Sequence, residues 1–437
     1  MRVDILAIGS QGDVQPCVAL GIGLQRAGHR VRVITLGGFE ELVRSRGLDH
    51  LVIGESPRDV ANTAAGRVWI QNRGSALGFL RGFVRVANSL IKEGIRSYWR
   101  ACQNTEHDTE MVIVSAMGLA VGSHIAEKLR VPLLQAQLAP PVVPTRYDWD
   151  GRKDLATAVR GRLRALVHAG FHFLIWSQLR RTTNEARRKI LELPPLPLAE
   201  SFRPTVRKPV RLLGAYSPAV VSRPPDWPDS IDVTGYWFLD DLPGWMPPDD
   251  LVDFMRSGAP PVFVGFGSTP FPQPEVTTKL VVRALERAGR RGILVAGGSG
   301  LATGRLSQDV FSLDFVPHSW LFSRVSAAVH HGGAGVTGAA LRAGLPSVVV
   351  PVFADQPFWS ERVFKLGVGP RPIAALRLTE DALAGAIHAT ASEDMVRRAA
   401  ALGERIRREE GVARAVEIIH EHFGGGTVEK VKHQHAH

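Results

Sequence analysis

Two adjacent histidines, His330 and His331, stand where an apolar run ends and a glycine-rich turn begins, in the sequence AAVHHGGAG. A small-residue helix is expected next, over about 336–343, and a second apolar run then stops at Asp355 and Gln356. This is a strand–turn–helix–strand unit whose polar groups lie just beyond the strand ends. Open parallel sheets bind ligands in that position, so the segment predicts a ligand site.

The glycine turn has the chemistry needed to bind a phosphate group. Glycines let backbone N–H groups approach an anion closely, and the start of a helix adds a favourable dipole. Asp355 and Gln356 add a carboxylate and an amide, which suit neighbouring hydroxyl groups. Two alternatives stay open, namely that Asp355 only caps the following helix and that the backbone satisfies His331. His330 points to the opposite side of its strand, so we expect it in the core.

The composition is that of an ordinary globular enzyme. The chain has 437 residues, of which 45% are hydrophobic and 22% charged, and its two cysteines form no disulfide framework. The start of the chain does not resemble a signal peptide and no run of 18 apolar residues occurs, so we expect a cytoplasmic protein. The net charge of +11 gathers partly in 160–190. That segment is a solvated helix face, a surface that attracts an anionic membrane, or a nucleic-acid patch, although it contains no known nucleic-acid motif.

Alternating strands and helices predict two doubly wound α/β units joined by a proline-rich segment. We expect an N-terminal domain over 1–215, a linker over 216–260 and a second domain over 261–400. The glycine-rich and histidine-rich tail over 424–437 is expected to be disordered.

The segments HHGGAGV and GLPSVVVPVFADQPFW, preceded by FVPHSWLF and GFGS, resemble the donor site of the family 1 nucleotide-sugar glycosyltransferases. GSQGDVQPCVALGIGLQRAGHRV resembles the N-terminal signature of the same family. The nearest branch is that of the sterol 3-β-glucosyltransferases and the bacterial antibiotic and glycolipid glycosyltransferases. The match covers about 1–140 and 261–400. It implies a GT-B fold, in which two facing Rossmann-like domains enclose the active site and a helix over 401–423 crosses back to the first domain.

The resemblance implies that the second domain binds the donor. His331 would hydrogen-bond the pyrophosphate, Asp355 and Gln356 would grip the sugar, and Phe315 to His318 would hold the base, with Trp320 as a rival aromatic platform. The donor residues that it implies are Gly12, Gly267, Ser268, Phe315, Val316, His318, Trp320, His331, Gly333, Ala334, Gly335, Val336, Thr337, Asp355 and Gln356. Relatives carry Thr-Thr or Ser-Thr where this chain has Val336 and Thr337, so one hydroxyl that normally reaches the phosphate is missing.

The resemblance places the catalytic base at Asp13, beside the first strand. A carboxylate within hydrogen-bond reach of a hydroxyl can take its proton as the new bond forms, and the departure of the nucleotide from the opposite face inverts the sugar. The alternative is that Asp13 only caps the helix near Pro16. No metal and no cofactor are expected. The DWD sequence at 148–150 has the form of a metal motif from another glycosyltransferase fold, and we interpret it as a chance match.

The expected function is therefore transfer of a sugar to a hydroxyl of an apolar small molecule such as a sterol or polyketide. UDP-glucose is the favoured donor, and a dTDP-sugar is the other option. The apolar segments LGFLRGFV and FHFLIW are expected to line the acceptor pocket. We expect a monomer or homodimer that binds no nucleic acid, with peripheral membrane contact left open. The alternatives are an inactive glycosyltransferase-like partner and a sugar-nucleotide epimerase or hydrolase.

Overall fold

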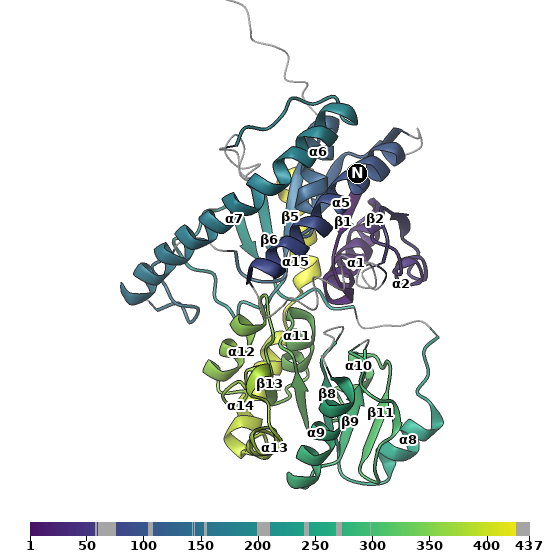
Figure 1. Ribbon diagram of the computed structural model, residues 1–437, viewed down its shortest axis with the longest axis vertical. Helices are drawn as coiled ribbons and strands as arrows, with labels where there is room; N and C mark the ends of the chain where they lie inside the picture. The colour runs from purple at the N-terminus through teal and green to yellow at the C-terminus, as the bar shows by residue number, and fades with distance from the viewer. Residues whose placement is uncertain are drawn as a thin grey trace, which may run out of the picture.

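Two α/β lobes, one above the other, make up the computed structural model (Figure 1). It describes residues 1–56, 59, 76–103, 108–141, 143, 145–152, 155–198, 210–239, 244–267, 273–297 and 299–424. Ser268 and the predicted disordered tail beyond residue 424 lie outside these residues. Within them, no helix combines the length and the apolar character that a membrane span requires.

Seven parallel strands form the sheet of the first lobe, in the order β3-β2-β1-β4-β5-β6-β7. They are β1 (Arg2–Ala7), β2 (Arg30–Thr35), β3 (Asp49–Val52), β4 (Met111–Val114), β5 (Leu133–Gln137), β6 (Arg211–Gly214) and β7 (Ile231–Val233). The central strands are runs of Val, Ile and Leu that are buried on both faces, as parallel strands usually are. The helices of this lobe are α1 (Gln11–Arg26), α2 (Glu40–Arg44), α5 (Ala76–Gln103), α6 (Leu119–Leu129) and α7 (Leu155–Lys189).

Six strands form the second sheet, in the order β10-β11-β9-β8-β12-β13, and only the edge strand β10 is antiparallel. They are β8 (Val262–Gly265), β9 (Gly292–Val295), β10 (Gly304–Arg305), β11 (Val310–Leu313), β12 (Ala327–His330) and β13 (Ser347–Val349). The helices are α8 (Asp249–Arg256), α9 (Pro274–Arg287), α10 (His318–Leu321), α11 (Ala334–Arg342), α12 (Gln356–Lys365), α13 (Glu380–Ala389) and α14 (Glu393–Arg407), with a 3₁₀ turn, η2, at Ala375–Arg377.

Strand order reverses on either side of the first strand of each sheet. β1 lies between β2 and β4, and β8 lies between β9 and β12. Helices leave opposite faces of the sheet at such a point, which opens a crevice beyond the carboxyl ends of the strands. The loops after β1, β8 and β12 therefore have the best position for a site.

The segment predicted as a linker contributes to the first sheet. Ile231–Val233 form β7 and pair with β6, although the sequence predicts a linker over 216–260. Trp227 and Ile231 pack with Leu212 in a small apolar cluster. The prolines at 224, 225 and 228 all precede β7, so residues 231–233 can pair at the sheet edge, where proline neighbours are tolerated.

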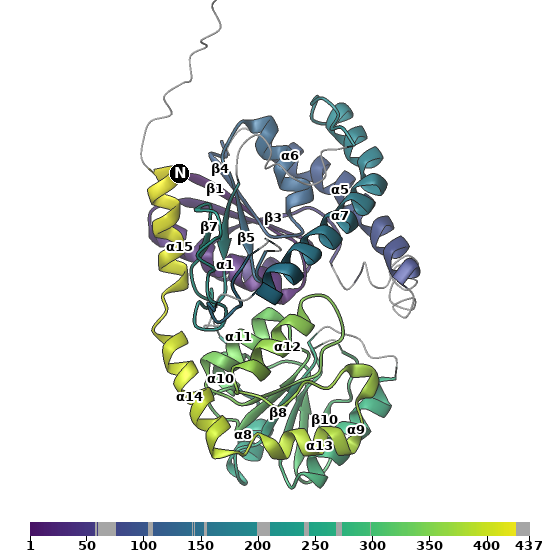
Figure 2. The same ribbon diagram turned by 90° about the vertical axis from the view of Figure 1, so that its left-hand side faces the viewer.

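The chain returns to the first lobe through two helices where the sequence predicts one over 401–423. α14 packs against α11 of the second lobe, whereas α15 (Gly411–Ile419) packs against α1 of the first. A short π-helix, η3 (His420–Gly424), follows. Figure 2 shows α14 and α15, in yellow, running along one side of both lobes. Gly411, the first residue of α15, lies on the backbone of residues 235–236, where a Cβ would come within 2.4 Å of the carbonyl oxygen of Tyr236.

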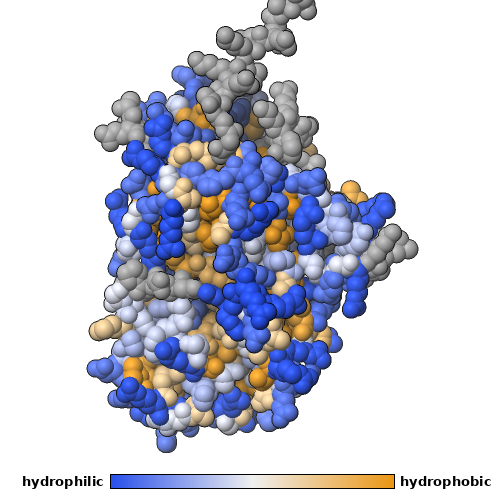
Figure 3. Space-filling model, turned by 180° about the vertical axis from the view of Figure 1, so that it is seen from behind, coloured by the Kyte–Doolittle hydropathy of each residue, from blue (hydrophilic) through white to orange (hydrophobic). Residues whose placement is uncertain are grey.

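Hydrophobic and hydrophilic residues intermingle over the rear of both lobes (Figure 3). The long helices α5 and α7 pack on each other and lie outside the sheet of the first lobe. Both are long additions to the alternating strands and helices of that lobe.

Candidate active site

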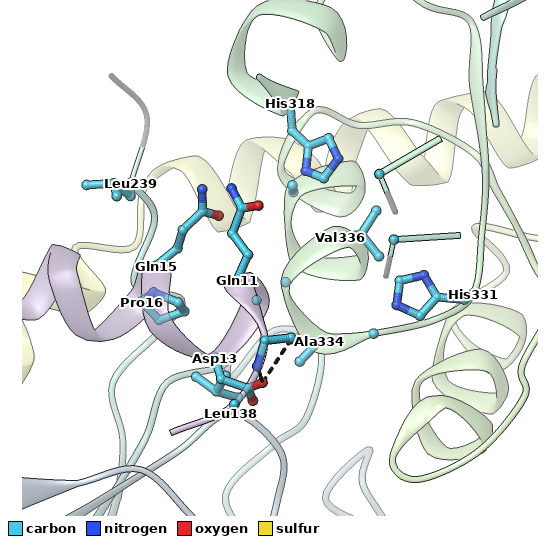
Figure 4. Close-up of a pocket in the computed structure, with 18 of the residues that line it drawn as sticks. Gln11, Asp13, Gln15, Pro16, Leu138, Leu239, His318, His331, Ala334 and Val336 are labelled. Atoms are coloured by element: carbon cyan, nitrogen blue, oxygen red, sulfur yellow. Dashed lines mark hydrogen bonds between the residues drawn. The ribbon is translucent and has the colours of Figure 1, made fainter. Parts of the chain in front are cut away.

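One large cleft, of about 1690 Å³, lies at the carboxyl ends of both sheets and takes its lining from both lobes. The first turns of α1 and α11 meet there, since a Cβ on Gly335 would lie only 3.7 Å from the Cα of Gly12. Of the predicted site residues, those that line the cleft are Gly12, Asp13, Gly267, Phe315, Val316, His318, His331, Gly333, Ala334, Gly335, Val336, Asp355 and Gln356. Figure 4 shows Asp13, His318, His331 and Val336 around this space.

Asp13 is both a helix-capping residue and a cleft residue. Its Oδ2 accepts hydrogen bonds from the backbone N–H and the hydroxyl of Ser10, at 2.7 and 2.9 Å. Within the described chain no residue bonds Oδ1, so one carboxylate oxygen remains for a ligand. Burial raises the pKa of Asp13, the bonds from Ser10 lower it, and the negative charge of Asp355 raises it further. The two predictions for Asp13, base and cap, are thus compatible, although the helix it caps begins at Gln11 rather than near Pro16.

His331 follows β12 and stands beside the end of β8, because His330 pairs with Gly265 in the sheet. Two glycines enclose its ring. A Cβ on Gly333 would lie 2.6 Å from Nε2, and one on Gly267 would lie 3.0 Å from Cε1. Burial lowers the pKa of His331 to about 4, while the backbone of Gly265 partly offsets that shift. His331 is therefore a neutral imidazole with one ring N–H at pH 7, and not a fixed cation.

The first turn of α11 has backbone N–H groups without a side-chain cap. Its N-cap is Gly333, which has no side chain to offer. Those N–H groups face the cleft beside His331, and they combine with the helix dipole to favour an anion. The α1 terminus differs, because Ser10 and Asp13 already satisfy each other there.

His330 lies in the core, where the side-chain alternation of a strand places it. It is fully buried, and its Nδ1 accepts a hydrogen bond from the backbone N–H of Gly332 at 3.1 Å. Burial lowers the pKa of His330 to about 3. The residue therefore holds the glycine turn in place as a neutral imidazole.

Asp355 and Gln356 end a tight loop after β13. Gln356 is 5% exposed, and its Oε1 accepts from the backbone N–H groups of Val352 and Phe353, at 2.8 and 3.1 Å. Asp355 precedes α12 and accepts a hydrogen bond from the indole of Trp359 at 2.8 Å. Burial raises the pKa of Asp355. Ala354 directly precedes Asp355. Its φ of 57° is strained for a residue with a Cβ.

Only part of the segment predicted to bind the base, 315–318, is exposed to the cleft. Phe315 is 43% exposed in the cleft, whereas Val316 is buried, and the ring of His318 stacks on Phe322 with centroids 4.5 Å apart. Burial lowers the pKa of His318 to about 4. Trp320 does not line the cleft. Its ring packs edge-on against Trp245, and the guanidinium of Arg324 stacks over it. Of the two candidate aromatic residues, only Phe315 is therefore exposed to the cleft.

Val336 and Thr337 have different environments. Val336 lines the cleft and is 9% exposed, with its side chain pointing between His318 and His331 (Figure 4). Thr337 is 1% exposed, does not line the cleft, and leaves its buried Oγ1 without a partner among the described residues. The hydroxyl of Thr337 is therefore not placed to replace the one that Val336 lacks.

Sequence reasoning missed polar residues on α1 and apolar residues from two loops. Gln11 and Gln15, one turn apart, face the cleft across from His318, and Leu138 and Leu239 close its floor and side (Figure 4). The spacing of four between the two glutamines was the available signal, because it places both on one face of α1.

The first-lobe half of the cleft is apolar with a charged rim. Its apolar members are Leu36, Val52, Ile53, Val86, Leu90, Met117, Leu138 and Leu239, and its charged ones are Arg46, Glu55, Arg85 and Glu93. α5 supplies several of them, but no residue of α7 lines the cleft. The prediction that FHFLIW lines an acceptor pocket is therefore wrong, because Phe171, Phe173 and Leu174 face outward. The side chains of LGFLRGFV lie almost entirely outside the described residues.

The DWD sequence joins the lobes. Oδ1 of Asp148 accepts from the backbone N–H groups of Asp150 and Arg152, at 3.0 and 2.7 Å. Asp150 forms an ion pair with Arg362 of α12 at 2.8 Å, and the ring of Trp149 packs edge-on against Phe358. In the described part of the chain, no group of three or more histidine, cysteine or acidic side chains could hold a metal ion.

Comparison with known proteins assigns both lobes. Residues 3–146 match the glycosyltransferase family 28 N-terminal domain, and residues 292–416 match the C-terminal domain of the erythromycin biosynthesis protein CIII-like family. The chain is 35% identical over 432 residues to sterol 3-beta-glucosyltransferase UGT80A2 of Arabidopsis thaliana, covering 97% of this chain and 66% of that protein. It is 36% identical over 433 residues to a sterol 3-beta-glucosyltransferase of Aspergillus terreus, covering 96% of this chain and 30% of that protein.

Solved structures share the whole fold. The glycotransferase of kitacinnamycin superposes with a TM-score of 0.68 at 18% identity, over 96% of this chain and 98% of that one. The Streptomyces sp. SF2575 glycosyltransferase SsfS6, solved with thymidine diphosphate, superposes with a TM-score of 0.63 at 18% identity, over 96% and 99%. The chain thus belongs to the nucleotide-sugar glycosyltransferases of the GT-B fold, with the sterol 3-beta-glucosyltransferases among its relatives.

Proposed function

We propose that the chain transfers a sugar, with inversion, from a nucleotide-sugar donor to a hydroxyl of an apolar small molecule such as a sterol. One observation carries this proposal. Asp13 from the first lobe and Asp355 from the second lie close enough in one cleft for the charge of Asp355 to raise the pKa of Asp13. A base and a sugar-binding carboxylate from facing domains are what such a transfer needs.

Asp13 is the proposed general base. Two hydrogen bonds from Ser10 hold Oδ2, and Oδ1 is directed to the acceptor hydroxyl, whose proton it takes as the new glycosidic bond forms. The raised pKa of Asp13 makes its carboxylate a stronger base than an exposed aspartate, provided that the pH is high enough to keep it ionised.

The leaving diphosphate is proposed to lie at the first turn of α11. Backbone N–H groups after Gly333 and the imidazole of His331 donate to it and stabilise the charge that develops as the bond to the sugar breaks. Gln356 and Asp355 contact the sugar hydroxyls, and Phe315 supports the base. In this arrangement most donor contacts come from the second lobe, and the acceptor faces the apolar lining of the first lobe.

The substrates are proposed from the relatives. Proteins named sterol 3-beta-glucosyltransferase match nearly all of this chain, which favours glucose as the sugar and a sterol as the acceptor. The chain spans only part of the length of these relatives, so glucose and a sterol remain proposals for this chain. UDP-glucose is the favoured donor and dTDP-glucose is the alternative. An epimerase or hydrolase is disfavoured, because neither would need the large apolar half of the cleft.

A thermal-shift series with nucleotide sugars tests the proposal. A ligand that binds only the folded state at about 100 times its Kd adds about 2.7 kcal/mol to stability, which raises the melting temperature by several degrees. We expect UDP-glucose and UDP to raise it, and Asp355→Asn to weaken the response to UDP-glucose more than the response to UDP. A chain that responds to no UDP or dTDP compound would contradict the donor assignment.

A further inference from the structure

The N-terminal half of α7 exposes an unusual amount of apolar surface on one face. Its large apolar side chains are 45–70% exposed. They are Val159, Leu163, Leu166, Val167, Phe171, Phe173 and Leu174, which we call the apolar stripe. Spacings of four, three and one along the helix place these side chains on one side of it. Soluble monomers rarely leave a continuous apolar patch of this kind unless something binds there.

The rest of α7 explains why the apolar stripe faces outward. Leu179, in the second half of the helix, is buried in the core of the first lobe, and the buried Trp176 donates its indole N–H to the carbonyl oxygen of Pro197 at 3.3 Å. On the side opposite the apolar stripe, a Cβ on Gly161 would lie 3.3 Å from the carbonyl oxygen of Thr145, so the helix rests on that loop. Figure 1 shows the N-terminal half of α7 projecting from the side of the lobe.

The positive charge of α7 favours an anionic partner for the apolar stripe. From residue 155 to residue 184 the sequence has no acidic residue, but it has arginines at 160, 162, 164, 180 and 181. Arg162 and Arg181 are exposed. A second copy of the chain would bring these like charges together, whereas an anionic surface would attract them. Basic amphipathic helices with Leu and Phe on one face bind anionic lipid in this way.

We propose that α7 docks the protein on the surface of an anionic lipid bilayer, with the apolar stripe at the boundary between headgroups and acyl chains and the exposed Arg162 and Arg181 among the headgroups. α7 packs on α5, which lines the first-lobe half of the cleft. If the proposed function holds, docking would bring that half close to the phase in which a sterol-like acceptor dissolves. The docking itself does not depend on the proposed function.

Vesicle co-sedimentation of the full chain tests the proposal. Wild type is mixed with phosphatidylglycerol vesicles and with phosphatidylcholine vesicles at low and at physiological salt. The stripe variant is Leu163→Glu with Leu166→Glu. The matched control is Leu376→Glu with Val276→Glu, which changes net charge equally at two exposed apolar positions of the second lobe. Circular dichroism and thermal melting check that both variants fold, and sedimentation velocity without lipid reports self-association.

We expect wild type to bind phosphatidylglycerol vesicles, to bind phosphatidylcholine vesicles far more weakly, and to lose affinity as salt rises. The stripe variant should bind the anionic vesicles at least tenfold more weakly, and the control should stay within about twofold of wild type. Three results would overturn the proposal: no binding of wild type, equal losses in both variants, or a wild-type dimer that only the stripe variant dissociates. The last result would make a second copy the occupant of the apolar stripe.

Discussion

Asp13 caps α1 through Ser10, and substitution can separate this contact from its proposed role as the general base. Asp13→Asn keeps an oxygen that can accept from Ser10, so the cap should survive while the base is lost. We expect kcat to fall by about 10² or more with donor affinity unchanged, the usual scale for a positioned general base. Steady-state kinetics and calorimetry with the nucleoside diphosphate measure the two quantities.

Ser10→Ala is the matched control for the cap. It removes one hydrogen bond to Asp13 and leaves the carboxylate in place. Loss of a helix-capping interaction typically costs about 0.5–2 kcal/mol, so the free energy of unfolding should fall while most turnover remains. If the two variants lost kcat equally, Asp13 would be a capping residue only.

Val336 marks the position where a hydroxyl can be restored. Val336→Thr is nearly isosteric and places a donor at the proposed diphosphate site, where a hydrogen bond to a charged group is worth roughly 1.5–3 kcal/mol. We expect about tenfold tighter binding of UDP, near 1.4 kcal/mol, with little change in stability. Val336→Ala removes the methyl groups without adding the hydroxyl and should not tighten binding. Titration calorimetry that gave wild type and Val336→Thr equal affinities would show that the hydroxyl is not needed.

Three buried histidines in and near the turn after β12 should make the second lobe sensitive to acid. Burial lowers the pKa values of His318, His330 and His331 to about 4, 3 and 4. Their stabilising effect is complete above the unfolded-state pKa near 6.5 and is lost as pH falls toward 4, because the unfolded chain binds protons first. Each histidine contributes a slope of up to about 1.4 kcal/mol per pH unit in that window.

His330→Asn tests this acid sensitivity. The amide oxygen can accept from Gly332 in place of Nδ1, but the side chain no longer titrates. We expect lower stability at pH 7 because ring volume is lost, together with a shallower decline between pH 6.5 and 4.5. Urea unfolding at several pH values measures both. An unchanged slope would mean that His330 is not neutral and buried as described.

The contact between residues 149–150 and α12 is expected to position the start of that helix, where Asp355 and Gln356 are proposed to bind the sugar. Arg362 is 3% exposed and pairs with Asp150, and it also donates to the carbonyl oxygen of Val220 at 2.8 and 3.0 Å. Asp150→Asn leaves this buried guanidinium with less compensation. Because Asp150 is itself 43% exposed, we expect a loss of about 1–2 kcal/mol rather than the larger cost of a fully buried pair, with weaker binding of UDP-glucose.

Asp148→Asn is the control for this contact, because an asparagine oxygen can still accept the two backbone N–H groups of the turn. Denaturant unfolding should separate the two variants, with Asp148→Asn near wild type. Equal stability losses would show that the ion pair between the lobes contributes nothing and that only the turn matters.

Much of the molecule could be predicted from short patterns. Buried apolar runs followed by glycine, as at β1 and β12, located the parallel strands, and the resemblance supplied their arrangement into two facing domains. Local patterns could not show that Ile231–Val233 join a sheet, since edge pairing depends on distant residues. They also could not show that Trp320 turns toward Trp245, or that Phe171 faces outward, because an aromatic residue on a helix looks the same whether it lines a pocket or a surface.

The central claim is inverting transfer across a cleft shared by the two lobes, and analysis of the product's anomeric configuration tests it most directly. The full chain is incubated with UDP-glucose and a panel of apolar acceptors that includes a 3β-hydroxysterol, and the product is examined by proton NMR. We expect a β-glucoside, the anomer opposite to that of the donor, with its formation reduced at least about a hundredfold by Asp13→Asn. An α-glucoside, or release of free glucose with no glycoside from any acceptor, would contradict the account.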